Sequence, residues 1–396
     1  MVALPFPVYD ADNHLYEPAE AFLRHLPKAF SKDFYYAEVA GRTKLVIDGQ
    51  LSEYIPNPTF EVVAAPGTHE IWYRAENREG KTLRELTGKA LRPPEEWRSG
   101  EGRLKVMDQQ GIHAALVFPT LASVIEARLG NSPEAISALF TSFNTWVDEE
   151  WGFHRAERLF AVPFIGLSDV EAAIDELEVN LKRGARAVGI RPAPVPHVRG
   201  SLSLGAAEFD PFWARCAEAK IFVCLHASDS GYDIARWWKA GSSRAEFRPF
   251  EKDPLGIMLE PLARPITDAF CSLIAHGALD RHPNLRIVSV ENGGDWVGNL
   301  FHRFDRAYGQ MPKAFSRHPR ETFTRQCFVA PSYEDDMNAL AKLLPAERIL
   351  FGSDFPHPEG LAEPLDYLKE FTDFSEGDIK RIFHGNLKGL LEGARD

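Results

Sequence analysis

The sequence has few cysteines and no long apolar run, and each shortage excludes a class of protein. The four cysteines, Cys216, Cys224, Cys271 and Cys327, form no C-x-x-C pair. We therefore expect buried, reduced thiols and a cytoplasmic location. No stretch approaches the roughly 20 apolar residues that a membrane-spanning helix needs. The first residues, MVALPFPVYDAD, have no basic segment and no apolar stretch of the kind found in a signal peptide.

The sequence also has no excess of positive charge, since its formal net charge is -12 at pH 7. A role in binding nucleic acid therefore has no electrostatic support. The chain contains no G-x-S-x-G and no Walker loop, which removes the main support for a serine hydrolase or a nucleotide hydrolase. We expect a small-molecule substrate and no nucleic-acid or membrane partner. A homo-oligomer is compatible with these features.

Short β-rich runs separated by helical patterns are what the sequence does contain. The runs are mostly continuous in apolar residues, which is typical of parallel strands that are buried on both faces. Eight repeats of strand and helix predict an α/β fold of the (β/α)8 barrel type. The alternative is an open doubly wound sheet, although no G-x-G-x-x-G follows the first run. The expected strands are 7–12, 114–120, 159–166, 185–190, 221–226, 285–291, 327–332 and 348–354, and the expected helices are 131–150, 169–182, 208–219, 261–280 and 293–311.

About a hundred residues separate the first two expected strands, far more than one crossover helix requires. Within them, the stretch TKLVIDGQLSEYI predicts a β-hairpin with Asp48 and Gly49 at its turn. We interpret 31–100 as a lid inserted in the first loop on the catalytic face of a single barrel domain that spans 1–396. The alternative is an extension for packing or dimerisation.

Acidic and histidine side chains stand where the expected strands end. Asp10, Asp12 and His14 are spaced by two, so a strand that continues through them would aim all three at one side. His226 and Asp354 each close another apolar run. Taken singly, the segment with Asp10, Asp12 and His14 could be a solvated turn. His226 could be a core histidine with its hydrogen bonds satisfied, and Asp354 could be a helix N-cap. Together they predict a metal site made by Asp12, His14, His226 and Asp354, a ligand set that suits Zn²⁺, Mn²⁺ or Fe²⁺.

Four segments carry a resemblance to a known family. They are YDADNHLYEP, HASDSG, ALDRHPNLRIVSVENGGDW and ILFGSDFPHPEG. The sequence resembles the amidohydrolase superfamily in its amidohydrolase-related branch, which includes aminocarboxymuconate-semialdehyde decarboxylase and resorcylate decarboxylases. The resemblance covers nearly the whole chain except the predicted lid. It implies a metal-dependent hydrolase or carboxy-lyase with ligands at Asp12, His14, His226 and Asp354.

The sequence departs from the family pattern in two places. Many members have a histidine after the sixth strand, where this chain has Glu291, so the resemblance leaves Glu291 or His276 as the acid–base group. Binuclear members use a lysine on the fourth strand, but this chain offers Arg191, which favours one divalent metal ion per chain. Arg191 would bind a substrate carboxylate or pair with a neighbouring acid. His357 and Glu17 would orient a metal ligand or cap a loop.

These residues predict metal-assisted chemistry on a small carboxylated or carbonyl-bearing, aromatic or cyclic molecule. The metal would hold the substrate or activate a water, and Asp354 would shuttle a proton. The resemblance favours cleavage of a C–C bond, by non-oxidative decarboxylation or by C–C hydrolysis. The alternatives are a metal-dependent ester, lactone or amide hydrolase and a non-catalytic metal-binding protein.

Overall fold

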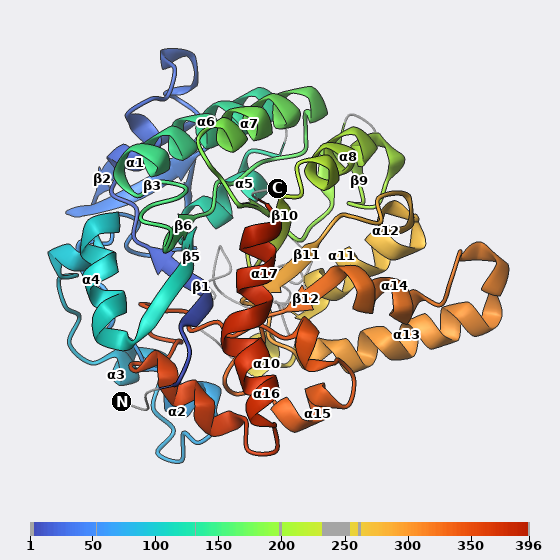
Figure 1. The fold of residues 1–396 in the computed structure, drawn as a ribbon. Helices are drawn as coiled ribbons and strands as arrows, with labels where there is room; N and C mark the ends of the chain where they lie inside the picture. Colours follow the sequence, from blue (N-terminus) through green and yellow to red (C-terminus); the bar gives the residue numbers. More distant parts are fainter. Residues whose placement is uncertain are drawn as a thin grey trace.

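Parallel strands form the centre of the molecule. The computed structural model describes residues 4–52, 54–130, 132–197, 200–231, 254–259 and 263–394. Two parallel sheets have the strand orders β1-β5-β6 and β7-β10-β11-β12 (Figure 1). Their strands are β1 (Val8–Leu15), β5 (Ile112–Pro119), β6 (Leu159–Ala161), β7 (Ala187–Ile190), β10 (Phe222–His226), β11 (Ile287–Val290) and β12 (Cys327–Val329).

Single backbone bridges link the two sheets to each other. Phe164 pairs with Gly189 between β6 and β7, and Val329 pairs with Ile349 beyond β12. Asn13 of β1 pairs in parallel with Phe355, and the amide of Asp354 donates to the carbonyl of Asp12 at 2.8 Å. The segment 349–355 therefore lies between β12 and β1 in the place of an eighth strand. Neighbouring strands are thus paired in the order in which they occur in the sequence, and the last segment pairs with the first strand, β1.

The expected strands and the observed ones agree in place and differ in extent. Seven of the eight runs contain a strand, which confirms that continuous apolar runs mark buried parallel strands here. The run 348–354 forms no named strand, because its pairing is limited to the bridges at Ile349 and Phe355. The first strand extends through His14 to Leu15, with irregular register between Asp10 and Asn13.

Helices surround the strands and cover their outer faces (Figure 1). The expected helix 261–280 is two helices in the structure, because Gly277 adopts φ +75° between them. The α-helices with eight or more residues are α4 (Gly100–Gln110), α6 (Pro133–Glu150), α7 (Val170–Lys182), α8 (Asp210–Glu218), α11 (Ala263–Ala275), α13 (Trp296–Gln310), α14 (Pro319–Gln326) and α17 (Asn386–Gly393). Shorter ones are α1 (Glu20–Leu23), α2 (Glu70–Tyr73), α3 (Leu83–Thr87), α5 (Ile125–Arg128), α10 (Pro254–Met258), α12 (Ala278–Arg281), α15 (Met337–Ala341) and α16 (Glu376–Lys380).

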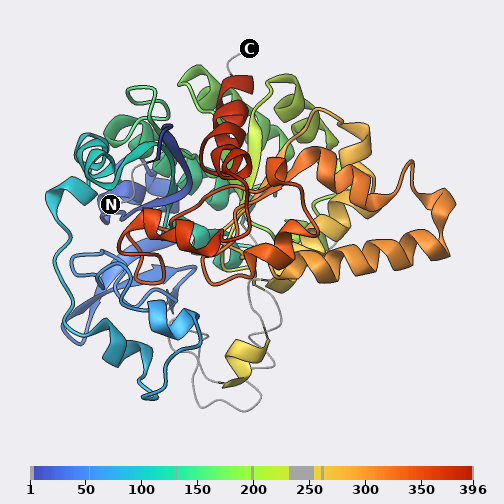
Figure 2. The same ribbon diagram turned by 60° about the horizontal axis from the view of Figure 1, so that its bottom comes forward.

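The long connection between β1 and β5 contains a small antiparallel sheet. Its strands are β2 (Phe34–Val39), β3 (Arg42–Ile47) and β4 (Gln50–Ser52). The predicted hairpin between β3 and β4 is confirmed, with positive φ at both Asp48 and Gly49, as a tight hairpin turn requires. The sequence did not indicate β2. A second antiparallel pair joins β8 (Val195–His197) to β9 (Gly200–Leu202). Figure 2 shows the elements of 31–100, coloured blue to cyan, gathered on one side of the molecule.

A fully buried arginine fixes the carboxyl end of β1. The guanidinium of Arg103, on α4, donates to the carbonyl of His14 at 2.8 Å and to the side chain of Asn13. It also lies over the rings of Trp151 and Phe355, at 5.5 and 5.4 Å from their centres. Arg103 therefore connects β1, α4 and the segment 349–355. None of the described helices combines the length and the apolar character needed to span a membrane.

Replacing Arg103 with methionine is expected to lower the free energy of unfolding by roughly 3 kcal/mol, because buried acceptors of Asn13 and His14 lose their donors. Urea unfolding measures the change. The matched control is Lys105→Met on the same helix, since the Lys105 side chain is 65% exposed. An equal effect of both substitutions would contradict the role given to Arg103.

Candidate metal centre

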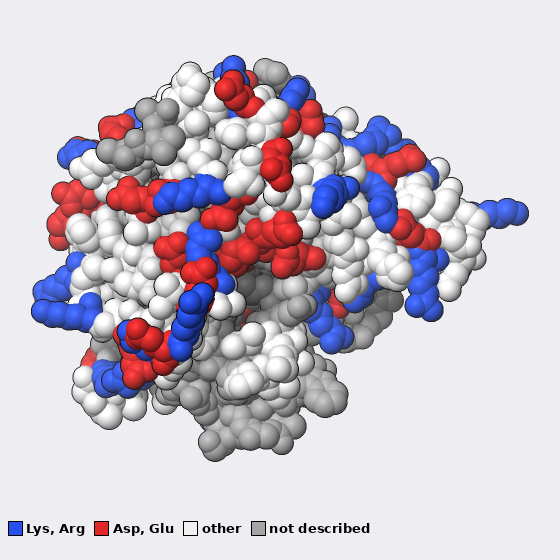
Figure 3. All heavy atoms as spheres, turned by 90° about the horizontal axis from the view of Figure 1, so that it is seen from below, with Lys and Arg blue, Asp and Glu red and all other residues white. Residues whose placement is uncertain are grey.

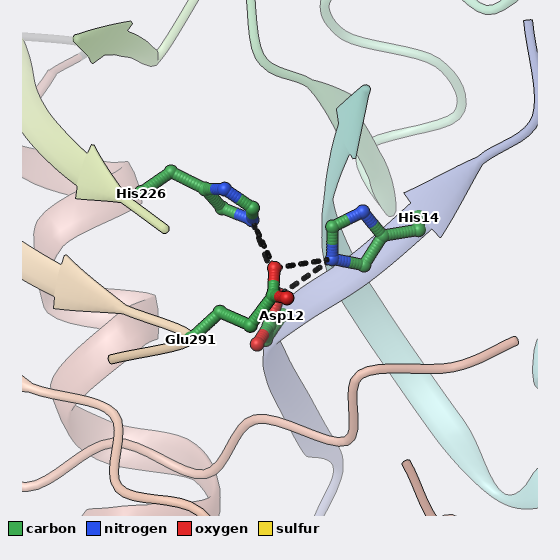
Figure 4. A group of neighbouring side chains, drawn as sticks. All are labelled: Asp12, His14, His226 and Glu291. Atoms are coloured by element: carbon green, nitrogen blue, oxygen red, sulfur yellow. Dashed lines mark ion pairs between the residues drawn. The ribbon is translucent and has the colours of Figure 1, made fainter. Parts of the chain in front are cut away.

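The side chains predicted to bind metal meet at the carboxyl ends of the strands. Asp12 and His14 belong to β1, and His226 is the last residue of β10. Glu291 directly follows β11, and Asp354 lies in the segment that pairs with β1. Figure 4 shows the side chains of Asp12, His14, His226 and Glu291 pointing toward one another. Parallel strands bring their carboxyl ends to one side, which explains why residues so far apart in sequence converge.

The distances define two overlapping groups of donor atoms. His14 Nε2 lies 3.2 Å from Asp12 Oδ1, 3.2 Å from Glu291 Oε2 and 3.3 Å from Asp354 Oδ1. His226 Nε2 lies 3.0 Å from Glu291 Oε2. One group is Asp12, His14, His226 and Glu291, and the other is His14, Glu291, Asp354 and His357; within each group the donor atoms lie within 4.8 Å of one another. His14 and Glu291 belong to both groups.

The donor atoms are buried and lie at ion-pair distance from one another, but they make no hydrogen bonds in the part of the chain that the structure describes. Asp12 Oδ1, His14 Nε2, His226 Nε2 and Asp354 Oδ1 are shielded from solvent and make no hydrogen bond within the described residues. Leaving a buried polar atom unsatisfied costs roughly 1–3 kcal/mol, so several together at one point require a common partner. A divalent cation satisfies carboxylate and imidazole donors at once. The residues therefore fit one divalent metal ion.

A backbone carbonyl fixes the orientation of one of these histidines. His226 Nδ1 lies 2.8 Å from the carbonyl oxygen of Ala227. A carbonyl can only accept, so Nδ1 carries the proton and donates it. In the neutral ring Nε2 is then unprotonated and faces the cluster. This is the arrangement by which a neighbouring acceptor prepares a histidine to bind a metal.

The electrostatics of the cluster show a shortage of positive charge. Burial lowers the pKa of His14, but the carboxylates of Asp12 and Glu291 outweigh burial and raise it to about 10. Burial and the nearby carboxylate of Glu291 raise the pKa of Asp354 well above its usual value. Without a cation the cluster therefore retains protons on groups that would otherwise ligate. A divalent cation supplies the same positive charge without those protons.

The backbone is strained at two of the cluster residues. Glu291 has φ +58° and Asp354 has φ +55°, a region that non-glycine residues seldom occupy. Glu291 directly follows β11, and Asp354 directly precedes Phe355, which pairs with Asn13 of β1. Such strain persists where the surrounding structure holds it and is concentrated at functional sites.

Two of the other predicted residues have structural partners. Glu17 is buried and its Oε1 accepts from the amides of Leu121 and Ala122 at 2.8 and 3.1 Å, so it holds the loop after β5. Arg191 is buried and its Nε lies 3.7 Å from Glu126 Oε2, which is the ion-pair alternative that the sequence allowed. Neither side chain belongs to the two donor groups.

Asp10 and His276, two further residues that the sequence singled out, lie outside the two donor groups. Asp10 is fully buried and accepts from the amide and hydroxyl of Ser353 at 2.9 and 2.6 Å, which joins β1 to the segment 349–355. His276 is exposed and follows the last residue of α11, ahead of the amino end of β11. The carboxyl end of that strand carries Glu291 instead. The structure therefore places His276 away from both donor groups and does not favour it as a substitute for a family histidine.

His357 comes closer to the cluster than the sequence indicated. Its Nδ1 lies 2.8 Å from Asp354 Oδ1, and its ring centre lies 3.9 Å from that of His14. Its other nitrogen, Nε2, lies 3.0 Å from Thr120 Oγ1. Sequence reasoning missed Thr120, although a polar residue at the end of the expected strand 114–120 was a usable signal. It also missed Arg103, which lies inside a helix and gives no such signal.

The comparisons with known proteins show the family of the chain. The family model described as Amidohydrolase matches residues 9–387. A gamma-resorcylate decarboxylase from Rhodococcus jostii (strain RHA1) is 26% identical over 73% of this chain and 86% of its own. The crystal structure of an amidohydrolase from Mycobacterium avium subsp. paratuberculosis K-10 is 39% identical, covers 98% of both chains and has a TM-score of 0.92.

A more distant solved structure has the same fold and contains a metal. It is a dihydroxybenzoic acid decarboxylase from Polaromonas sp. JS666 with bound manganese and the inhibitor 2-nitroresorcinol. It is 17% identical, covers 98% of this chain and 97% of its own, and has a TM-score of 0.60. The present chain belongs to the amidohydrolase family. It is an enzyme of the amidohydrolase type whose cofactor is one divalent metal ion.

Proposed function

We propose that this protein catalyses the non-oxidative decarboxylation of a small aromatic carboxylic acid. The observation that carries the proposal is the buried cluster of carboxylate and imidazole atoms, without hydrogen bonds among the described residues, at the strand ends of an amidohydrolase chain. The similarity to a gamma-resorcylate decarboxylase over most of both chains supports this reaction over hydrolysis. We propose Asp12, His14 and His226 as metal ligands, with Asp354 as the predicted fourth ligand and Glu291 as an alternative fourth ligand.

The exposure of the cluster residues supports Asp12, His14 and His226 as buried ligands and Asp354 and Glu291 as the carboxylates nearer to the substrate. The side chains of His14, His226 and Asp12 are 1%, 2% and 6% exposed, whereas those of Asp354 and Glu291 are 14% and 23% exposed. When bound, the metal would hold the substrate's carboxylate and an adjacent oxygen. Asp354, the carboxyl with the raised pKa, is then the group placed to deliver a proton to the ring carbon as the bond to the carboxyl carbon breaks, and the ionised Glu291 is placed to accept one.

We further propose a closed (β/α)8 barrel with 31–100 as its lid. The bridges that return from the segment 349–355 to β1 support closure. Three contacts support the lid. The amide of His69 donates to the carbonyl of Pro358 at 3.0 Å, Gly67 packs closely on Ala362, and the ring of Phe60 stacks on Tyr16 with centres 5.0 Å apart. The ring centre of Tyr16 lies 5.8 Å from that of His357, so the proposed lid reaches the edge of the cluster.

The charge of the protein does not favour a large anionic partner. Figure 3 shows one face of the molecule, on which acidic side chains gather near the middle. The net charge of -12 has the same sign as a nucleic acid. These features favour a small molecule as the partner.

The reaction is tested with protein loaded with Mn²⁺ or Zn²⁺, given hydroxybenzoic acids that carry a hydroxyl beside the carboxyl group. Release of carbon dioxide and formation of the matching phenol would support the proposal. Activity confined to ring-cleavage products, with water incorporated, would replace decarboxylation by C–C hydrolysis. Metal binding without turnover on either panel would contradict the proposed reaction.

Replacing Phe60 with alanine tests the proposed lid. We expect weaker substrate binding, seen as a KM raised roughly two- to tenfold, because a stacked aromatic pair contributes about 0.5–1.5 kcal/mol. Metal content, measured by elemental analysis, should not change. The matched control is Val62→Ala, since Val62 is 44% exposed in the same connection. Loss of metal together with affinity would favour a packing role for this segment.

A further inference from the structure

His357 has two different neighbours on its two ring nitrogens. Nδ1 faces the cluster, 2.8 Å from Asp354 Oδ1, yet neither atom makes a hydrogen bond in the described residues. Nε2 faces away from the cluster and lies 3.0 Å from the hydroxyl oxygen of Thr120. The His357 side chain is 8% exposed, and its ring packs against that of His14, whose ring centre is 3.9 Å away. The position of the ring proton therefore determines whether His357 presents an N–H group or a nitrogen lone pair to the cluster.

The hydroxyl of Thr120 determines where that proton lies. Thr120 Oγ1 is 2.9 Å from the carbonyl oxygen of Leu15, and it donates its hydrogen to that oxygen. A hydroxyl has one hydrogen, and a carbonyl cannot donate, so toward His357 the oxygen of Thr120 can only accept. His357 Nε2 must then carry the ring proton. In the neutral ring Nδ1 is left with a lone pair directed at the cluster.

We propose that Thr120 is a positioning residue that holds His357 as its Nε2–H tautomer and so presents an unprotonated Nδ1 to the metal centre. This proposal rests on the metal centre proposed above, and it gives a role to a residue outside both donor groups. With Nδ1 unprotonated, His357 accepts a hydrogen bond from the carboxyl of Asp354 or donates its lone pair to the cation. The opposite tautomer would present an N–H to the cluster and leave the Leu15 carbonyl without its donor.

The loop that carries Thr120 is fixed in two further ways. Glu17 accepts from the amides of the next two residues, Leu121 and Ala122. The hydroxyl of Ser123 donates to the carbonyl of Thr120 at 2.8 Å. The buried carboxylate of Glu17 therefore positions Thr120, and Thr120 in turn positions His357. This gives Glu17 an indirect effect on the cluster, through the loop after β5.

The test compares Thr120→Val, which keeps the shape and removes the hydroxyl, with Thr120→Ser, which restores the hydroxyl. In protein labelled with ¹⁵N-histidine, two-dimensional ¹H–¹⁵N spectra distinguish the two tautomers, and loss of one signal in His357→Gln assigns it. Spectra are recorded without metal and with Zn²⁺. The matched control is Thr267→Val in α11, because its hydroxyl also donates to a backbone carbonyl, that of Ala263 at 2.6 Å.

We expect the Nε2–H form in the parent protein, in Thr120→Ser and in Thr267→Val. Thr120→Val should lose it and should bind Zn²⁺ roughly ten- to a hundredfold more weakly, the usual effect of removing an outer partner of a metal site. An Nδ1–H form in the parent protein, or an unchanged tautomer in Thr120→Val, would overturn the proposal. A failure of the proposed function appears separately, as a parent protein that binds no metal or releases no carbon dioxide.

Discussion

Replacing His226 with alanine is expected to remove most of the bound divalent metal and to abolish turnover. His226 Nε2 is buried, lies 3.0 Å from Glu291 Oε2, and is kept unprotonated in the neutral ring because Nδ1 donates to Ala227. Removing this imidazole leaves the site one donor short and leaves neighbouring carboxylates buried beside an empty space. The measurement is elemental analysis of purified protein, with turnover recorded on the same samples.

The control for this experiment is His276→Ala. His276 was an acid–base candidate from the sequence, but the structure places it exposed at the end of α11. Its removal should leave both metal content and activity close to the parent values. If His226→Ala retains a full complement of metal, the proposed ligand set is wrong. If His276→Ala loses activity, the acid–base group lies outside the cluster described above.

Replacing Glu291 with glutamine is expected to reduce turnover roughly a hundredfold or more, the usual contribution of a positioned acid–base group. The substitution keeps the shape of the side chain and removes its charge. His226 and His14, both in contact with Glu291, hold the pKa of its carboxyl well below the usual range despite the opposing effect of burial, so the parent side chain is ionised. The left-handed backbone at Glu291 is unaffected by the change.

The metal content of Glu291→Gln distinguishes the two roles open to this residue. We expect it to stay close to that of the parent, because Asp12, His14, His226 and Asp354 remain. Parallel loss of metal and turnover would instead identify Glu291 as an essential ligand. Full turnover would leave it only a backbone role at the end of β11. The control is Glu363→Gln, an exposed carboxylate outside both donor groups.

The position of the strands, and therefore of the residues at their ends, was predictable from local sequence. A continuous apolar run followed by a charged residue requires nothing distant in the chain, and His226 illustrates this as the last residue of β10. The spacing of Asp12 and His14 likewise predicted that both lie on the same strand, β1. The Asp48-Gly49 turn was predictable because few residue pairs tolerate two successive positive φ angles.

Contacts between distant segments were decided only by the tertiary structure. Asp10 has the same local pattern as Asp12, but it accepts a hydrogen bond from Ser353, 343 residues away, whereas Asp12 Oδ1 lies 3.2 Å from His14 Nε2. Thr120 acquires its role only where β5, the end of β1 and the loop after Asp354 meet. Periodicity determines which residues end a strand. The direction of each side chain depends on packing against neighbours that local sequence does not specify.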